Sequence, residues 1–314
     1  MTLPTRSFEK VPYHLRRAKQ VERRMLIDAL QILADIGFPI REYQYTGFGS
    51  TFFVDFTLFH KLLGINKMLS VEIVLDIEKR VRFNKPFDCI DIAMKPIADV
   101  IPDLSADQKH ILWLDYDDIL HRERLEEITS AAAQLSLGSI LLVTLDAEPP
   151  KGDEPNQWRD YYIEQAGRYL GTSAGKIENF AKSNLPKIIV QIIRQAIKEG
   201  LAGRRGVEFI PLFNFVYSDG HLMLSLGGML GTQSNRRRIR TSKLKEANYI
   251  RFNLKDEPFN INIPNLTLKE RMRLDHAMPC AEGWVPEEFE IKSEDVASYC
   301  QIYRFFPAYA ELLL

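Results

Sequence analysis

The sequence has few cysteines and no residue spacing that suits a metal. Only Cys89, Cys280 and Cys300 occur among 314 residues, and they lie far apart, unlike the cysteines of a disulfide-rich secreted domain. The six histidines form no close pairs with cysteines or carboxylates, so no bound metal is expected. We therefore predict reduced thiols and a cytoplasmic location.

Long apolar runs and a strong net charge are also absent. The amino terminus has no apolar signal core and no stretch reaches membrane length, so no membrane association is expected. The net charge is −1, which means that any nucleic-acid surface must be local. The composition, with 46% hydrophobic and 26% charged residues, is that of a globular protein able to bury a sizeable core.

The most informative stretch, residues 45–72, reads as a strand, a glycine turn, a helix and a second strand. Gly47 and Gly49 remove Cβ atoms at the turn, where the chain would pass close to a ligand. The helix has aromatic and aliphatic residues at helical spacing and ends at Gly64. Glu72 then ends the second strand, 23 residues after Gly49 (72 − 49). A Rossmann-like unit places a ribose-binding carboxylate at a similar offset of ~20 residues.

A third glycine, which the dinucleotide fingerprint requires, is missing, since Phe52 and Phe53 occupy its neighbourhood. A tight turn without a ligand is the alternative interpretation of the glycines, but the acid at the strand end favours a pocket. The absent glycine argues against a pyrophosphate and for a nucleoside cofactor such as S-adenosylmethionine. The expected cofactor-binding residues are Tyr45, Gly47, Phe48, Gly49, Ser50 and Glu72.

A second informative stretch, residues 110–118, is an apolar strand that ends in acids around a tyrosine. Ligands bind at the carboxyl ends of strands in open α/β sheets, so Asp115, Tyr116 and Asp117 should face the same crevice as Glu72. Asp118 is expected instead to cap a helix over residues 119–135.

Two segments are rich in basic residues. A helix predicted at 13–33 carries Arg17, Lys19 and Arg23, which would bind an anionic substrate if the helix folds back over the crevice; a solvated helix face is the alternative. The segment 235–251 is compatible with phosphate contacts to nucleic acid, and a solvated loop is equally compatible with it. Its candidate contacts are Arg236, Arg237, Arg238 and Arg240.

The order of strands and helices predicts an α/β fold. Residues 139–145 form a continuous aliphatic run typical of a central parallel strand, and Asp219-Gly220 is a hairpin turn between two antiparallel strands. We expect a Rossmann-like, mostly parallel seven-stranded sheet closed by an antiparallel hairpin, with a helical insertion and a C-terminal appendage. The insertion, at 151–206, is either a crossover or a subdomain over the pocket.

Three regions are expected along the chain. They are a basic N-terminal helix (1–40), an α/β domain (41–235), and a basic loop with a C-terminal module (236–314). The segment 299–314 is apolar enough to pack on the main body or on a second subunit, which would make a homo-oligomer.

Several motifs resemble those of class I S-adenosylmethionine-dependent methyltransferases. Gly47-Phe48-Gly49 stands at the glycine motif, Glu72 at the acid ending strand two, and Leu114-Asp115-Tyr116-Asp117 at the motif after strand four. This resemblance covers roughly residues 41–227. The segments RAKQVER (17–23), YTGFGS (45–50), DFTLFHK (55–61) and WLDYD (113–117) are more narrowly similar to a bacterial family labelled putative O-methyltransferases.

The resemblance implies an enzyme that transfers a methyl group from S-adenosylmethionine to an unidentified, anionic or nucleic-acid acceptor. Asp115 would be the base or positioning group, Tyr116 would pack on the acceptor, and Asp117 would complete the catalytic set. The sequence departs from the pattern in its missing glycine, and it lacks the Asp/Asn-Pro-Pro-Tyr/Phe motif of amino-methylating DNA enzymes. The alternative is therefore a degenerate fold that binds a nucleotide as a sensor or interaction module without methyl transfer.

Overall fold

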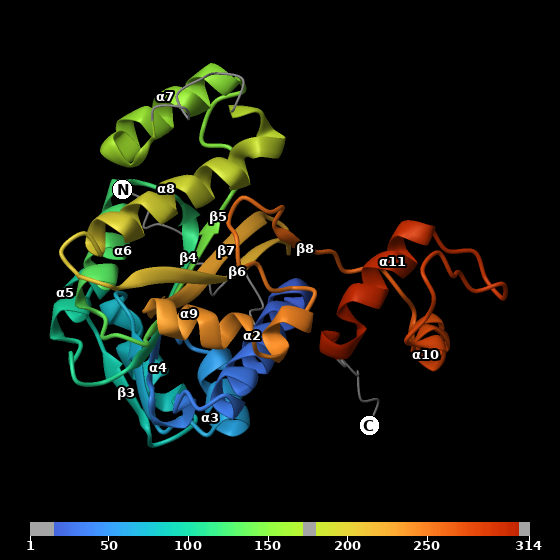
Figure 1. Ribbon diagram of the computed structural model, residues 1–314, viewed down its shortest axis with the longest axis horizontal. Helices are drawn as coiled ribbons and strands as arrows, with labels where there is room; N and C mark the ends of the chain where they lie inside the picture. Colours follow the sequence, from blue (N-terminus) through green and yellow to red (C-terminus); the bar gives the residue numbers. More distant parts are fainter. Residues whose placement is uncertain (1–15, 172–179, 308–314) are drawn as a thin grey trace.

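The computed structural model describes residues 16–171 and 180–307. Its centre is an eight-stranded sheet in the order β3-β2-β1-β4-β5-β7-β6-β8 (Figure 1). The first five strands run parallel, with β1 between β2 and β4. They are β1 (Gln44–Gly47), β2 (Lys67–Val71), β3 (Ile90–Ala93), β4 (His110–Ile119) and β5 (Ile140–Asp146).

An antiparallel hairpin closes the sheet. β7 (Leu222–Gly231) runs antiparallel to both β5 and β6 (Glu208–Ser218), around the predicted Asp219-Gly220 turn. The predicted fold class is thus confirmed. The sheet has one strand more than predicted, because β8 (Phe259–Ile261) adds to the edge of β6, and three residues are too few to show a strand period in the sequence.

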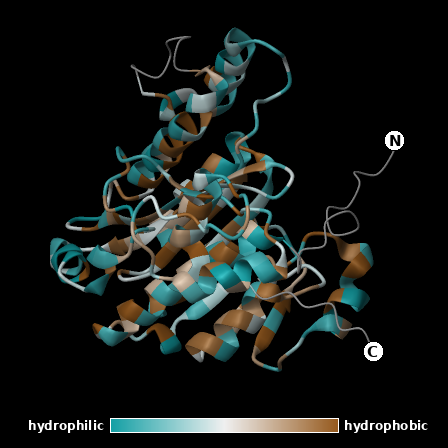
Figure 2. Ribbon diagram, turned by 90° about the vertical axis from the view of Figure 1, so that its right-hand side faces the viewer, coloured by the Kyte–Doolittle hydropathy of each residue, from teal (hydrophilic) through white to brown (hydrophobic). Residues whose placement is uncertain are grey.

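Helices cover both faces of the sheet, and the strand side chains alternate between them. In β4, Ile111 and Trp113 join the hydrophobic cluster that includes the first helix, whereas Leu112 and Leu114 join a second cluster with the helices that follow β4 and β5. Most helices in Figure 2 alternate between hydrophobic and hydrophilic colours, as expected for helices with one face in the core. The helices of this α/β part are α2 (Arg17–Asp35), α3 (Val54–Leu63), α4 (Glu78–Asn84), α5 (Ile97–Val100), α6 (Arg122–Gln134), α7 (Pro155–Ala166) and α8 (Leu185–Gly200).

The insertion at 151–206 contains α7 and α8, and α8 packs on α6. Along the chain, these helices connect β5 with β6 of the closing hairpin, and the contact with α6 favours the crossover interpretation of the insertion. The first predicted helix is observed as α2, and its predicted residues 13–15 lie outside the described part. In the described ranges 16–171 and 180–307, none of the helices combines the length and the apolar character needed to cross a membrane.

Residues 236–240, predicted as part of a basic loop, lie instead in the helix α9 (Gln233–Arg240). The helix begins with a capping box in which the Thr232 side chain accepts from the Asn235 N–H and the Asn235 side chain bonds back to the Thr232 backbone. The sequence analysis missed the helix because its charged residues give little apolar periodicity.

The C-terminal module has a small core of its own. Its two helices, α10 (Leu268–Ala277) and α11 (Ser293–Ile302), bury Leu274, Val296 and Tyr299 together and project to one side of the molecule in Figure 1. A capping box formed by Thr267 and Glu270 opens α10. Phe305 then contacts Tyr249, with ring centroids 5.4 Å apart, so the segment after α11 packs on the main body as far as it is described.

Candidate functional site

A cavity of about 310 Å³ lies at the carboxyl ends of the parallel strands. Its walls come from the loop after β1, the segments after β2 and β3, the end of β4, and the helices α2, α3 and α6. This is the edge at which open α/β sheets bind their ligands. Its polar and charged lining residues are Arg16, Arg23, Ser50, Asp55, Glu72, Lys95, Asp115, Tyr116, Asp117, Arg124 and Glu127.

The loop after β1 contributes three of its predicted residues, Phe48, Gly49 and Ser50, to the cavity lining, whereas Tyr45 and Gly47 lie behind it. A Cβ at Gly47 would lie 2.6 Å from the Tyr45 hydroxyl, and one at Gly49 would lie 2.5 Å from the Ser70 hydroxyl. Both glycines are therefore required by contacts within the protein. The predicted reason was the approach of a ligand, and of the two glycines only Gly49 lines the cavity.

Glu72 lines the cavity at the end of β2, where it was expected. Its Oε1 accepts hydrogen bonds from the backbone N–H groups of Ile73 and Val74, at 2.9 and 3.0 Å. These bonds hold the carboxylate in place, and no donor in the described part of the chain bonds to Oε2. Ile73 is exposed at the rim and gives this wall an apolar surface.

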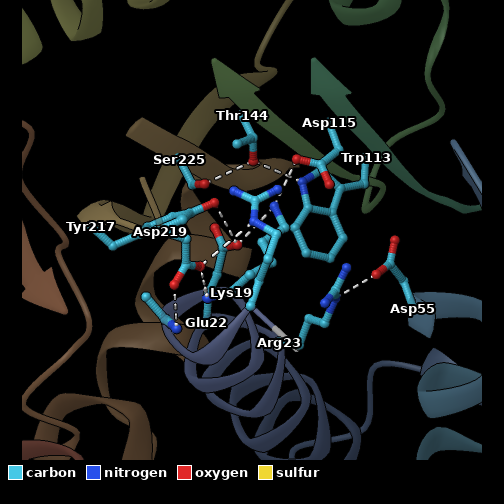
Figure 3. A network of polar contacts seen from close by, with 12 residues as sticks. Lys19, Glu22, Arg23, Asp55, Trp113, Asp115, Thr144, Tyr217, Asp219 and Ser225 are labelled. Carbon is cyan, nitrogen blue, oxygen red and sulfur yellow. Dashed lines mark hydrogen bonds and ion pairs between the residues drawn. The ribbon is translucent and has the colours of Figure 1, made fainter. Parts of the chain in front are cut away.

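Asp115 lies in the second half of β4, where the regular pairing with β5 ends in a register shift, and it is held from behind by Lys19 of α2 (Figure 3). The Lys19 Nζ lies 2.7 Å from the Asp115 Oδ1 and 2.9 Å from the Glu22 Oε2, and 4.3 Å from the centre of the Trp113 ring. Burial disfavours the charged form of Asp115, but the ion pair with Lys19, together with Arg16 and Arg23 nearby, outweighs it and lowers the pKa of Asp115. The lowered pKa keeps the carboxylate ionised and makes it a weak base, which suits a positioning group better than a general base.

The amino end of α2 is fixed by the hairpin turn. The two carboxylate oxygens of Asp219 accept from the backbone N–H groups of Ala18 and Lys19, at 3.0 and 2.9 Å (Figure 3). These N–H groups have no partners within the helix, and a carboxylate is also favoured by the helix dipole. Asp219, predicted only as a turn residue, therefore positions the helix that carries Lys19 and Arg23.

Arg23 reaches the cavity from the next turn of α2. Its Nε donates to the Asp55 Oδ1 at 2.5 Å, and the Tyr45 hydroxyl donates to the Asp55 Oδ2 at 3.3 Å. Of the three predicted substrate-binding cations, only Arg23 lines the cavity. Arg17 is exposed away from it and Lys19 is sealed behind Asp115, because α2 packs its buried charges against the sheet.

Tyr116 and Asp117 also line the cavity. The Tyr116 hydroxyl donates to the Glu127 Oε2 at 2.6 Å, and the Arg124 guanidinium lies 4.3 Å from the ring centre. Burial, reinforced by the Glu127 carboxylate, raises the pKa of Tyr116 well above its usual value, so the phenol stays protonated. Asp117 is exposed at the cavity mouth.

Asp118 does not cap the following helix, contrary to the prediction. β4 continues to Ile119, α6 begins at Arg122, and its N-cap residue is His121 without a side-chain cap. The Asp118 carboxylate instead accepts from the Arg124 guanidinium at 2.9 Å and so helps to hold that arginine under Tyr116.

Several lining residues were not among the predicted site residues. Arg124 and Glu127 lie one turn apart on α6, where no local pattern marks them out. Asp55 lies in the first turn of α3 and begins the DFTLFHK segment, which was noted only for its resemblance to the family. Their position depends on how these helices pack at the sheet edge. The charged lining as a whole contains five carboxylates and four cationic groups. In the part of the chain that the structure describes, no group of three or more His, Cys, Asp or Glu side chains is arranged for a metal ion.

Three arginines of α9, away from the cavity, are engaged within the protein. Arg236 forms two hydrogen bonds to the Glu208 carboxylate, at 2.7 and 2.8 Å. Arg238 donates to the Ile36 carbonyl, and Arg240 donates to the Phe252 carbonyl at 3.2 Å. Arg237, Arg238 and Arg240 are exposed. Three of the four predicted nucleic-acid contacts thus also bond within the protein, and contact of these arginines with nucleic acid stays a prediction.

Comparison with known proteins gives one match over nearly the whole sequence. A family described as "Putative O-methyltransferase" matches residues 11–314. Among curated proteins, no sequence matches significantly.

Solved structures that are similar to this chain share little sequence with it. Trm1 from Pyrococcus horikoshii, in complex with S-adenosyl-L-methionine, is 13% identical, with a TM-score of 0.43, over 70% of this chain and 56% of Trm1. The chain thus spans little more than half of that protein. A fibrillarin pre-rRNA processing protein from Methanococcus jannaschii is 11% identical, with a TM-score of 0.37, over 62% of this chain and 70% of that chain. The O-methyltransferase TomG from Streptomyces achromogenes, in complex with SAM, is 12% identical, with a TM-score of 0.37, over 69% of this chain and 90% of TomG.

Proposed function

Because this chain belongs to the family of putative O-methyltransferases, we propose that its cavity binds S-adenosylmethionine and that the methyl group is transferred to an acceptor beside the end of β4. The observation that supports this use of the cavity most directly is the arrangement of Glu72, Gly49 and Asp115 around one space at the carboxyl ends of β1, β2 and β4. An open α/β sheet binds nucleosides in this way.

The donor's nucleoside would lie between β1 and β2. Glu72, held by the Ile73 and Val74 N–H groups, offers Oε2 to the ribose hydroxyls. Ile73 and Ile97 provide apolar surface for the adenine on the side of β3. The backbone of Gly49 and Ser50 would then face the amino-acid part of the donor.

The sulfonium of the bound donor supplies an already activated methyl group, so the protein's contribution is alignment and exclusion of water. Asp115, ionised and fixed by Lys19, is a positioning group. Tyr116, immobilised by Glu127 and Arg124, forms a wall against which an acceptor can pack. The exposed Asp117 at the mouth is the remaining carboxylate that could accept a proton from an acceptor hydroxyl.

The charges of the cavity favour an uncharged acceptor. Carboxylates slightly outnumber cations in the lining, and Arg124, the arginine beside Tyr116, is paired with both Asp118 and Glu127. An anionic or nucleic-acid acceptor would have to approach these carboxylates at an electrostatic cost. We therefore favour a small molecule with a free hydroxyl.

Isothermal titration with S-adenosylmethionine tests the first step. We expect binding to the wild type and a loss of about 10- to 100-fold in affinity for Glu72→Gln, which is the usual worth of a hydrogen bond to a charged group, roughly 1.5–3 kcal/mol. The matched control is Glu78→Gln, an exposed carboxylate on α4 that is paired with Arg82 and does not line the cavity. Absence of binding at millimolar donor, with folded protein, would refute the proposal. Binding without methylation of any hydroxyl compound would instead support the sensor alternative.

A further inference from the structure

Arg23 and Asp115 bring opposite charges to the end of the cavity that α2 covers. Each is held from behind by a residue of the other charge: the Asp55 Oδ1 lies 2.5 Å from the Arg23 Nε, and the Lys19 Nζ lies 2.7 Å from the Asp115 Oδ1. Figure 3 shows these residues in one network around Trp113. The two cavity-lining charges are therefore each fixed by another residue and do not form an ion pair with each other.

The guanidinium of Arg23 has unused hydrogen-bonding capacity. The side chain is 3% exposed, and its Nη1 is buried without a hydrogen-bond partner among the described residues. A buried donor left unpaired is costly, and a charged donor more so. Because Arg23 also lines the cavity, a ligand oxygen is the natural partner.

Asp115 has corresponding capacity as an acceptor. Its side chain is 18% exposed, on a residue that lines the cavity, and the bond from Lys19 uses Oδ1 only. Arg23 and Asp115 are close enough for each charge to favour the ionised form of the other, lowering the pKa of Asp115 and raising that of Arg23. The cavity thus presents a fixed donor and a fixed acceptor, of opposite charge, near one another.

We propose that Arg23 and Asp115 together bind an α-amino acid group, with the carboxylate accepting from Arg23 and the ammonium donating to Asp115. A zwitterion carries two opposite charges on neighbouring atoms, and this pair of side chains matches both. The inference rests on the proposed function, since the amino acid group in question is the methionine end of the donor. Arg23 is then a donor-specificity residue and no longer a substrate-binding one, and the group that Asp115 positions is the donor's ammonium.

Truncated ligands separate the two contacts. The probes are S-adenosylhomocysteine, its decarboxylated form, which keeps the ammonium, and methylthioadenosine, which has neither group. We expect the wild type to prefer S-adenosylhomocysteine to the decarboxylated form by about 10- to 100-fold. Arg23→Gln should abolish this preference. Asp115→Asn should weaken both amine-bearing probes and leave methylthioadenosine unchanged.

Controls make the outcomes distinguishable. Lys95→Gln removes another cation of the lining and should preserve the preference. Retained methylthioadenosine affinity shows that a variant's cavity is folded. Because Arg23→Gln leaves Asp55 without its cation, the double variant Arg23→Gln/Asp55→Asn, which removes both charges, is measured as well.

If the wild type binds none of the three probes, the proposed function itself fails. If the wild type binds S-adenosylhomocysteine but the folded Arg23 variants keep the full preference over the decarboxylated form, the role assigned to Arg23 is overturned while the proposed function stands. Unchanged affinity of the amine-bearing probes for Asp115→Asn would overturn the role assigned to Asp115.

Discussion

Asp115 shows how one ion pair decides the chemistry open to a residue. Without Lys19, a carboxylate at this depth would have a raised pKa and could serve as a base near neutral pH. Lys19 reverses the direction of the shift, and it does so from a position that is completely buried. The lowered pKa restricts Asp115 as a proton acceptor, so of the two roles predicted from the sequence, base or positioning group, we propose the second.

A pH profile should reflect this restriction. Asp115 has a folded-state pKa below its ordinary value of 3.8, so its contribution to stability is fully present above that value and is lost as the pH falls through the folded-state pKa. We expect donor affinity to show no inflection due to Asp115 between about pH 5 and about pH 9. Titration calorimetry across this range, with Asp115→Asn as comparison, provides the measurement. An inflection near neutrality that disappears in Asp115→Asn would contradict the assignment.

For the two motif glycines, the predicted position was correct but the predicted reason for their small size was incomplete. Their place at the turn after β1 was predicted correctly. Their small size is needed beside the Tyr45 hydroxyl and the Ser70 hydroxyl, and these contacts form only once β1, β2 and α3 have packed. Spacing along the chain cannot reveal which neighbour a missing Cβ makes room for.

At the scale of elements, α2 is attached to the sheet by its charged residues as well as its apolar ones. The helix is capped by Asp219 from the β6–β7 turn, and its Lys19 and Arg23 pair with β4 and α3. Any loosening of its first turn would displace Arg23, which lines the cavity, and Lys19, which lies behind Asp115. The cap therefore connects fold stability with ligand binding.

Removing this cap should affect both properties. Asp219→Ala is expected to lower the free energy of unfolding by about 1 kcal/mol, the typical cost of a lost N-terminal cap, and to weaken donor binding as well. Thr267→Ala is the matched control, because it removes the cap of α10, which is distant from the cavity. It should cost similar stability in urea denaturation and leave binding unchanged. If Asp219→Ala also left binding unchanged, the connection between cap and cavity would be wrong.

Element boundaries were predictable where the pattern was long. The strands predicted at 110–118 and 139–145 are observed at 110–119 and 140–146, and the predicted hairpin is observed as well. β8 was missed because it is too short, and α9 because its residues are mostly basic. The acidic strand ends reached the cavity as predicted, but Arg16, Asp55, Arg124 and Glu127 come from helix packing that a single sequence does not encode locally.

At the scale of the whole molecule, the net charge of −1 and the contacts of the α9 arginines within the protein both disfavour strong binding to nucleic acids. Arg236, Arg238 and Arg240 donate to groups of the protein, although Arg238 and Arg240 remain exposed. The side chains of Arg237, Lys243 and Lys245 are also exposed and bond to none of the described residues. Three such unpaired cations are fewer than the phosphate contacts that strong binding requires.

We therefore expect only weak binding to a single-stranded oligonucleotide in fluorescence anisotropy. The logarithm of any association constant should fall with that of salt with a slope no steeper than about −2, roughly −0.7 for each of three contacts. Arg237→Ala should reduce the slope by about one contact, whereas Arg17→Ala, an exposed arginine on α2, should not change it. A slope several times steeper would show that the arginines of α9 can leave their protein partners for phosphates.

The contact between Asp219 and the first turn of α2 also constrains the order of folding during protein synthesis. The two partners are separated by 200 residues, so at a synthesis rate of about 5–20 residues per second α2 leaves the ribosome roughly 10–40 seconds before its cap. During that interval the first turn of α2 lacks the Asp219 cap, so the nascent helix is exposed to solvent or bound by a chaperone. The cavity can take shape only when more than two thirds of the chain has been translated.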